Sequence, residues 1–163
     1  ITGTSQLLSV PYALYAGSSQ NKGKTSIVIT GNITNAQAAA QIAAEFGPYT
    51  ENVYIRNTSE LTAVDLSMIT SLVDLRITNN SALTSINLSN LKSLMAVDIY
   101  LSKNAFPSSQ INALLNKFLT FIPLGTYIFI GLEGQTPPAP PTGQGIIDKA
   151  NLEAAGFVDI STD

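Results

Sequence analysis

Apolar residues recur on a fixed grid between residues 61 and 100. The blocks LTAVDLSMITS, LVDLRITNNSA, LTSINLSNLKS and LMAVDIYLSKN follow one another every 11 residues, and alternate blocks are most alike, so the structural unit is 22 residues. This spacing predicts a structure in which each unit buries its apolar edge only against its neighbours. The three apolar columns are Leu61, Leu72, Leu83 and Leu94; Val64, Leu75, Ile86 and Val97; and Leu66, Ile77, Leu88 and Ile99.

The same spacing predicts the main strands. Pairs of apolar residues on the inward face of one sheet are Ile27/Ile29, Val53/Ile55, Leu75/Ile77, Val97/Ile99 and, after an insertion, Leu124-x-x-Tyr127-x-Phe129-x-x-Leu132. We therefore predict about five parallel strands in one sheet. A shorter return sheet is predicted from the pairs Val64/Leu66 and Ile86/Leu88.

Helical spacing appears in three further segments. Thr34 and Gln37 form a capping-box pattern ahead of residues 35–46. The predicted inward face of that helix is Ala36, Ala39, Ala43 and Phe46, and that of a helix over 109–119 is Ile111, Leu114, Leu115 and Phe118. A short helix over 146–155 and a last strand over 157–160 follow. The predicted fold is an α/β solenoid with 22-residue turns, short return strands and two to three flanking helices.

Composition divides the chain into four parts. Residues 1–19 are predicted to form an apolar strand that ends, or partners, a β-domain, because Leu8, Val10, Tyr12 and Leu14 alternate with other residues. Residues 25–133 form the predicted solenoid, and 134–145, GQTPPAPPTGQG, an extended Pro-rich connector. Residues 146–163 are the predicted C-terminal cap, which a solenoid needs to cover its last apolar end.

Three stretches resemble segments of bacterial surface proteins or of leucine-rich-repeat proteins. Leu72-x-x-Leu75-x-Ile77-x-x-Asn80 resembles the leucine-rich-repeat consensus, and the helix-first layout is similar to the receptor L domain. That resemblance implies that the Asn80 side chain bonds backbone groups at a turn, with Thr58 and Ser102 at the equivalent positions. Residues 2–16 resemble the GT-x-x-LLSVPYALYA segment of secreted surface and fibre proteins of Gram-negative bacteria, and the GQTPPAPPTGQG ending resembles the closing element of bacterial leucine-rich-repeat proteins. We therefore expect a secreted or cell-surface bacterial protein with a further β-domain upstream.

The outward positions of the main strands form the candidate binding face. The predicted columns are Val28, Tyr54, Arg76, Asp98 and Ile128; Thr30, Arg56, Thr78, Tyr100 and Ile130; and Asn52, Asp74 and Ala96. Tyr and Arg are enriched at binding hot spots. The candidate binding residues are Tyr54, Arg56, Asp74, Arg76, Asp98 and Tyr100. The alternative is a structural ladder in which Arg76 pairs with Asp74 or Asp98, and both interpretations can hold together.

The N-terminal strand also leaves two interpretations open. It folds back over its own solenoid and shields the first turn, or it is donated to a neighbouring subunit, as in strand-complemented filaments. The candidate assembly residues are Leu8, Val10, Tyr12 and Leu14.

Composition narrows the chemistry. The chain has no Cys and no His, which excludes thiol nucleophiles, imidazole or thiolate metal sites and disulfides. Its net charge is −3 and its few Lys and Arg are scattered, so we expect no nucleic-acid partner. No apolar run is long enough to span a membrane, and no calcium-loop motif occurs.

We therefore expect a non-enzymatic adhesion or recognition module with no cofactor and no metal, whose protein or glycan ligand the sequence does not specify. The alternative is a filament subunit assembled through residues 1–16. A carbohydrate-active enzyme is a distant third, because Asp74 and Asp98 have no supporting acid or base.

Overall fold

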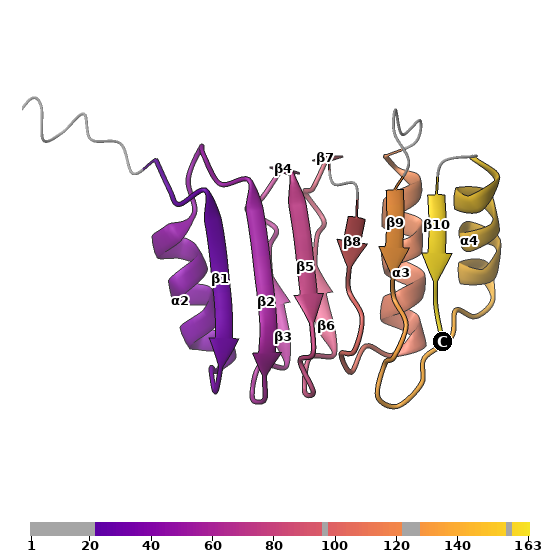
Figure 1. Ribbon diagram of the computed structural model, residues 1–163, viewed down its shortest axis with the longest axis horizontal. Coiled ribbons are helices and arrows are strands. Elements are labelled where there is room, and N and C mark those ends of the chain that lie inside the picture. Colours follow the sequence, from indigo (N-terminus) through magenta and orange to yellow (C-terminus); the bar gives the residue numbers. More distant parts are fainter. Residues whose placement is uncertain (1–21, 96–97, 122–127, 156–157) are drawn as a thin grey trace, which may run out of the picture.

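The computed structural model describes residues 22–95, 98–121, 128–155 and 158–163, and these residues adopt an α/β fold built on a parallel sheet (Figure 1). Six described strands pair in chain order, β1-β2-β5-β8-β9-β10, and every pair is parallel. These strands are β1 (Ser26–Gly31), β2 (Asn52–Thr58), β5 (Asp74–Thr78), β8 (Asp98–Tyr100), β9 (Ile128–Gly131) and β10 (Val158–Ser161).

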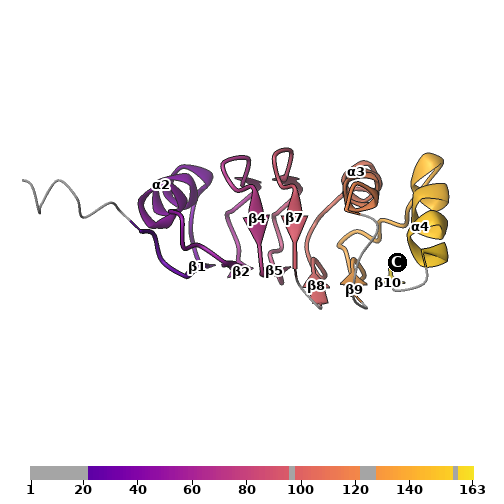
Figure 2. The same cartoon turned by 90° about the horizontal axis from the view of Figure 1, so that it is seen from above.

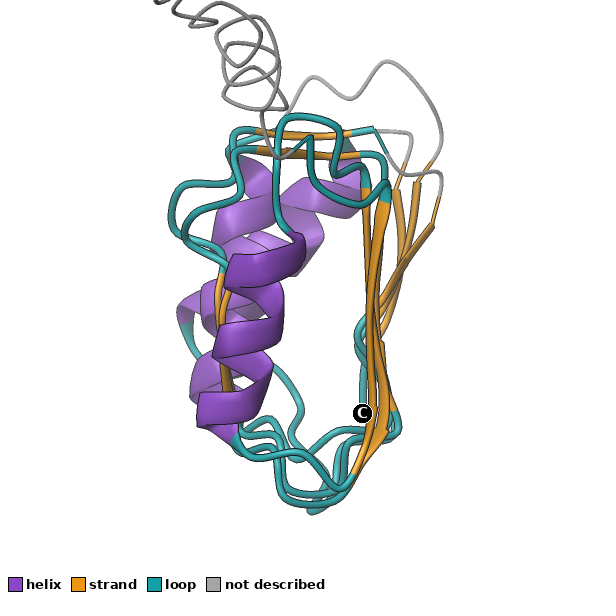
Figure 3. Ribbon diagram, turned by 90° about the vertical axis from the view of Figure 1, so that its left-hand side faces the viewer, coloured by secondary structure: helices purple, strands orange, loops and turns teal. Residues whose placement is uncertain are grey.

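Three helices of the described chain lie on one side of this sheet (Figures 2 and 3). They are α2 (Asn35–Glu45), α3 (Ser108–Leu119) and α4 (Gln144–Ala154). Between α2 and α3, two short parallel sheets replace a helix on the return path: one lies in the layer of the helices, and the other crosses from that layer toward the main sheet (Figure 2). One pairs β3 (Ala63–Asp65) with β6 (Ser85–Asn87), and the other pairs β4 (Ser71–Leu72) with β7 (Ser93–Leu94). The β3–β6 pair confirms the predicted return sheet, whereas β4–β7 was not predicted.

The core lies between the main sheet and the helices. Each main strand contributes at least one aliphatic side chain to a row that crosses the whole sheet, and each member of the row is at most 5% exposed. The row is Ile27, Val53, Leu75, Ile99, Ile130 and Ile160, which are successive strand partners. Burying such a side chain contributes about 1.5–3 kcal/mol. The predicted inward position of the first three strands is thus confirmed.

The register changes between β5 and β8. Val53 pairs with Leu75, a step of 22 residues, but Leu75 pairs with Ile99, a step of 24. The predicted pairing of Leu75 with Val97 is therefore wrong. Two extra residues therefore precede β8. Because side chains alternate with a period of two, a shift by two residues keeps inward residues inward, but each residue of β8 lies beside a different partner on β5 from the one predicted.

The prediction for the last strand of the grid, observed as β9, was out of register by one residue. Ile128 and Ile130, predicted to face outward, are 3% and 1% exposed, and Phe129, predicted to face inward, is half-buried. The physical cause is the same alternation, since a shift by one residue moves each side chain to the opposite face. Leu132 is buried, as predicted.

Helix α2 begins as predicted but presents a different face. Thr34 is its N-cap, and Gln37 completes the capping box. The buried residues are Ala38 and Ile42, whereas the predicted face of Ala36, Ala39 and Ala43 is exposed. Alanine occurs on every side of this helix, so the single large aliphatic residue sets its orientation.

Helix α3 was predicted correctly, because all four residues of its predicted inward face are buried. They are Ile111, Leu114, Leu115 and Phe118. The predicted C-terminal helix and strand are present as α4 and β10, and β10 joins the main sheet beside β9.

A row of buried polar side chains, here called the amide row, follows the C-terminal ends of four consecutive main strands. It consists of Thr58, Asn80, Asn104 and Gln135, each at most 3% exposed. The residue just before each of them has a positive φ, between 56° and 71°. At three of these positions the residue is not glycine, namely Asn57, Asn79 and Lys103.

Each amide of this row bonds the unit before it. Asn80 Oδ1 accepts from Thr58 N at 3.1 Å, and Asn80 Nδ2 donates to Ile55 O at 3.1 Å. Asn104 repeats the arrangement, with Nδ2 donating to Ile77 O at 2.8 Å and Oδ1 accepting from Asn80 Nδ2 at 2.9 Å. The residue equivalent to Asn80 is therefore Asn104 and not Ser102, again because of the two extra residues.

Candidate binding face

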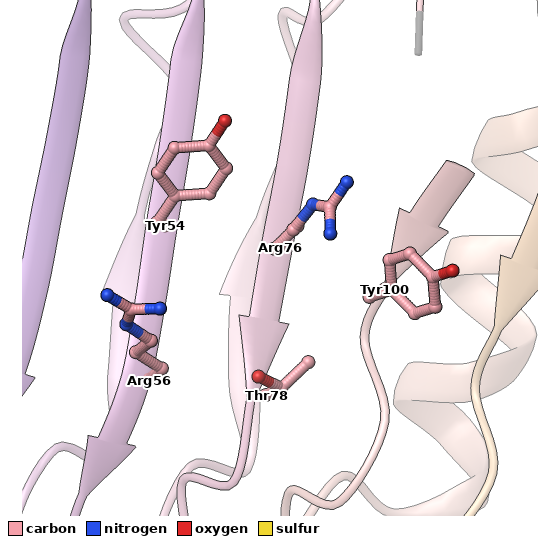
Figure 4. Close-up of a pocket in the computed structure, with 5 residues that line it drawn as sticks. All are labelled: Tyr54, Arg56, Arg76, Thr78 and Tyr100. Carbon is pink, nitrogen blue, oxygen red and sulfur yellow. The ribbon is translucent and has the colours of Figure 1, made fainter. Parts of the chain in front are cut away.

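Three adjacent strands present the candidate residues on the outer face of the main sheet, opposite the helices. Tyr54 and Arg56 lie on β2, Arg76 and Thr78 on β5, and Tyr100 on β8, and together these five residues line a pocket of about 290 Å³ (Figure 4). The alternation of each strand explains their common direction, because their neighbours Val53, Ile55, Leu75, Ile77 and Ile99 are buried in the core.

Arg76 is the centre of this group. Its Cα pairs with that of Tyr54 on one side and that of Tyr100 on the other. The guanidinium carbon lies 5.0 Å from the centroid of the Tyr100 ring, which is a cation–π contact. Because the sequence interpretation placed Tyr100 beside Thr78 and Asp98 beside Arg76, those two pairings are wrong, and the shift of β8 brings an aromatic ring to Arg76 instead of a carboxylate.

Asp74 holds two of the pocket side chains in place. Its carboxylate accepts a hydrogen bond from the Tyr54 hydroxyl at 3.0 Å and forms an ion pair with Arg76 Nε at 3.0 Å. Partial burial, followed by this hydrogen bond and the negative charge of Asp74, raises the pKa of Tyr54 above its ordinary value of 10.0. Tyr54 and Arg76 are therefore oriented before any ligand arrives.

Of the two pairings in the predicted structural ladder, the structure shows Arg76 with Asp74, and the side chain of Asp98 lies outside the described part of the chain. Arg76 pairs with Asp74 two residues away on the same strand, so this ion pair runs along β5 and does not join neighbouring strands. Half of the Arg76 side chain is exposed, and an ion pair of this kind is worth about 0–1 kcal/mol. The pair orients Arg76 more than it stabilises the sheet.

Arg56 differs from Arg76. Its side chain is exposed, and among the described residues it makes no ion pair and no hydrogen bond. Its charge and five N–H donors are available to a ligand.

Phe129 extends the aromatic part of this face. Its ring centroid lies 5.6 Å from that of Tyr100, with the planes tilted by 49°. The sequence interpretation missed Phe129, and the signal that identifies it is the alternation around it, since Ile128 and Ile130 are both aliphatic.

The structure thus brings together Tyr54, Arg56, Arg76 and Tyr100, with Asp74 beside Arg76 on the same face of β5. The backbone of Asp98 lies opposite Phe129; its side chain lies outside the described part of the structure, as do the assembly residues Leu8, Val10, Tyr12 and Leu14.

Two features are absent from the described residues: a cluster of metal ligands and a helix that could span a membrane. Within these ranges there is no group of three or more His, Cys, Asp or Glu side chains that could hold a metal ion. No helix of the described chain has the length and apolar character needed to cross a membrane.

The structure therefore defines an α/β fold with a parallel sheet whose outer face carries a group of Tyr and Arg side chains, of which Tyr54 and Arg76 are oriented by Asp74. Comparisons with models of known protein families, with curated proteins and with solved structures find no match to this chain.

Proposed function

We propose that the chain is a non-enzymatic recognition module of an exported bacterial protein and that the outer face of its main sheet binds the ligand. The observation that carries this proposal is the pocket lined by Tyr54, Arg56, Arg76, Thr78 and Tyr100. Two arginines and two tyrosines around one pocket are the residue types that dominate binding energy at protein interfaces.

The finer fold in this proposal is a leucine-rich-repeat-like solenoid. Three features support it. Main strands follow one another in chain order, most of them separated by a return segment or helix on the same side. Val53 and Leu75 keep the 22-residue step, and the amide row connects each unit to the one before it. These are the properties expected of units that stack on their neighbours.

Preorganisation favours binding over a purely structural role. Arg76 and Tyr54 are held by Asp74, so a ligand does not have to pay for ordering these side chains. Tyr100 and Phe129 provide flat aromatic surface beside the guanidinium. Arg56 adds a charge that no described residue neutralises. A glycan or a protein segment with an acidic group fits these features.

Catalysis is not part of the proposal. Hydrolysis of a glycan by paired carboxylates needs one acid free to donate a proton and one free to act as nucleophile or base. Asp74 is already engaged by Tyr54 and Arg76, so its carboxylate is held as a structural acceptor.

The test measures binding of the full chain to an array of immobilised glycans and extracellular proteins. The double variant Arg56→Ala/Tyr100→Ala is expected to lose the binding that the unsubstituted chain shows. Lys92→Ala, which also removes an exposed charge but lies away from this face, is the matched control and should bind normally. If the double variant binds as well as the control, the outer face is not the recognition surface.

A second candidate function is a filament subunit assembled through residues 1–16. It is favoured by exposed apolar side chains near the beginning of the main strands, Tyr49, Val73 and Met95. Deletion of residues 1–16 should then abolish polymers seen by electron microscopy. Polymers that survive the deletion would exclude strand donation.

A further inference from the structure

An open groove of about 310 Å³ lies apart from the binding face, between the end of α2 and the strand β4. Its lining includes Phe46 and Pro48 on the α2 side and Leu72, Val73 and Met95 on the other. Val73 and Met95 are 37% and 65% exposed, and Tyr49, next to the groove, is 57% exposed. Large apolar side chains gathered at one place on a surface indicate a contact that is missing.

The groove is also bordered by a strand with an unused edge. The carbonyls of Thr70, just before β4, and of Leu72, within β4, accept hydrogen bonds from Lys92 N at 2.8 Å and Met95 N at 2.9 Å, so both point to the side on which β7 lies. Backbone groups of successive strand residues point to opposite sides, and Val73 N accordingly donates to Glu51 O on the other side at 2.7 Å.

Ser71 lies between Thr70 and Leu72, so its N–H and C=O point away from β7, toward the groove that Ser71 lines. Among the described residues Ser71 makes no hydrogen bond on that side. An edge of this kind accepts an added strand through main-chain hydrogen bonds.

The described chain begins at the wall of this groove. Lys22 O accepts a hydrogen bond from Tyr49 N at 3.0 Å, and Lys22 Nζ lies 5.5 Å from the centroid of the Tyr49 ring. Gly23 is pressed against Gly47, a residue of the groove, and a Cβ added to Gly23 would lie 2.3 Å from Gly47 N. The segment before residue 22 thus starts beside the exposed apolar side chains.

We propose that residues 7–16 of the same chain occupy this groove as an added strand beside β4. Leu8, Val10, Tyr12 and Leu14 alternate along this segment, so one of its faces can cover Val73 and Met95 while its main chain bonds Ser71. Pro11 lacks a donor, which suits an edge strand.

The occupant is the chain's own segment because of its length and position. Residues 17–21, between the segment and Lys22, reach up to about 16–18 Å when extended, enough to turn back onto the groove. A segment tethered this closely has an effective concentration in the millimolar range, which favours the same chain over a second copy.

Methionine oxidation tests the proposal with an internal control. The chain has two methionines, Met68 at 44% exposure and Met95 at 65%, in the described structure. An empty groove predicts that hydrogen peroxide oxidises Met95 about 1.5-fold faster than Met68, the ratio of these exposed fractions. A docked segment reverses the order, so Met95 is oxidised more slowly.

The comparison variant is Val10→Asp/Tyr12→Asp in the full chain, which places charges on the apolar face of the segment. Peptide mass spectrometry should show Met95 oxidation rising above that of Met68 in this variant, with Met68 unchanged. If Met95 is already oxidised faster than Met68 in the unsubstituted chain, at the rate seen in the variant, the proposal is wrong.

A cysteine pair distinguishes the same chain from a second copy, because the chain has no Cys of its own. Tyr12→Cys/Val73→Cys should form an intramolecular disulfide under mild oxidation and remain a monomer. Tyr12→Cys/Thr78→Cys, with its second cysteine on the opposite part of the surface, should not. Disulfide-linked dimers of the first variant would assign the segment to a neighbouring copy, and absence of a disulfide would exclude the groove; either result overturns the proposal.

Discussion

The amide row and the binding face cross the same strands but use their polar side chains in opposite ways. In the amide row, Asn80 and Asn104 are buried and bond backbone groups of the preceding unit through both atoms of the amide. On the face, Arg56 is exposed and bonds no described residue.

The end of the amide row sharpens the difference. Gln135 Nε2 donates to Leu101 O and Leu132 O, and its own N–H is bonded by the Asp163 carboxylate, which also accepts from Gly134 N and Ala139 N. At this end of the amide row, the hydrogen bonds of Gln135 are thus completed by other groups of the chain. On the binding face, Arg56 has donors left for a ligand. Polar residues that recur along the sheet stabilise the fold where all their hydrogen bonds are made within the chain. Where donors are left unpaired, the same kinds of residue can bind a ligand.

The largest effect is expected from the core beneath both regions. Ile77→Asp puts an unpaired charge at a position that is 0% exposed, which costs several kcal/mol against a total stability of about 5–15 kcal/mol. Circular dichroism should show an unfolded chain at 25 °C. A folded variant with native-like thermal unfolding would contradict the strand register.

The amide row should be the next most sensitive. Asn104→Ala leaves Ile77 O, Leu101 O and Asn80 N without their side-chain partner, and we expect a loss of about 2–4 kcal/mol in the free energy of unfolding. Urea denaturation measures it. Asn151→Ala, an exposed asparagine on α4, is the control and should change stability by less than about 0.5 kcal/mol. Equal losses would remove the distinction between the row and the surface.

The support beneath the face should matter little for stability. Asp74→Asn removes an ion pair worth about 0–1 kcal/mol, because the Arg76 side chain is half exposed. The loss in the free energy of binding to the array ligand should exceed the loss in the free energy of unfolding, because Arg76 and Tyr54 lose the group that orients them. A variant with intact binding would mean that preorganisation by Asp74 is unimportant.

The smallest effect concerns pH. The folded pKa of Tyr54 is raised, so the stability contributed by its hydrogen bond to Asp74 is complete below the unfolded pKa of about 10 and disappears as pH rises through the folded value. Compared with Tyr54→Phe, the unsubstituted chain should lose an advantage of at most about 0.5 kcal/mol as the pH rises above 10, because this hydrogen bond is largely exposed to solvent. Parallel denaturation curves at each pH measure this difference, and a constant difference would exclude the contribution.

Regular spacing explains why much of the fold could be predicted. Residues such as Val53, Leu75 and Ile77 are fixed by a two-residue alternation inside a 22-residue step, and burial follows directly from it. An insertion breaks that logic. The two extra residues before β8 place Tyr100 beside Arg76. No apolar pattern marks them, because Val97, Ile99 and Leu101 alternate with other residues and a shift by two residues leaves apolar residues at the inward positions.

Asn104 was the signal for the correct register, since it repeats Asn80 after 24 residues. The face of α2 could not be predicted for a related reason, because its alanines surround the helix and only packing selects Ala38 and Ile42. The residues of the candidate face were predicted from the outward positions of the strands, and Tyr54, Arg56, Arg76 and Tyr100 lie in one pocket, but the pairings between them depend on the register.

The most direct test of the central claim measures binding and thermal unfolding together for two variants, Arg56→Ala/Tyr100→Ala and Asn104→Ala. The first should keep the melting temperature within about 2 °C and lose at least about tenfold in affinity for the array ligand. The second should melt well below the unsubstituted chain yet bind normally at temperatures where it is folded. The reverse result, with binding lost in Asn104→Ala and stability lost in the face variant, would contradict the division between a structural row and a recognition face.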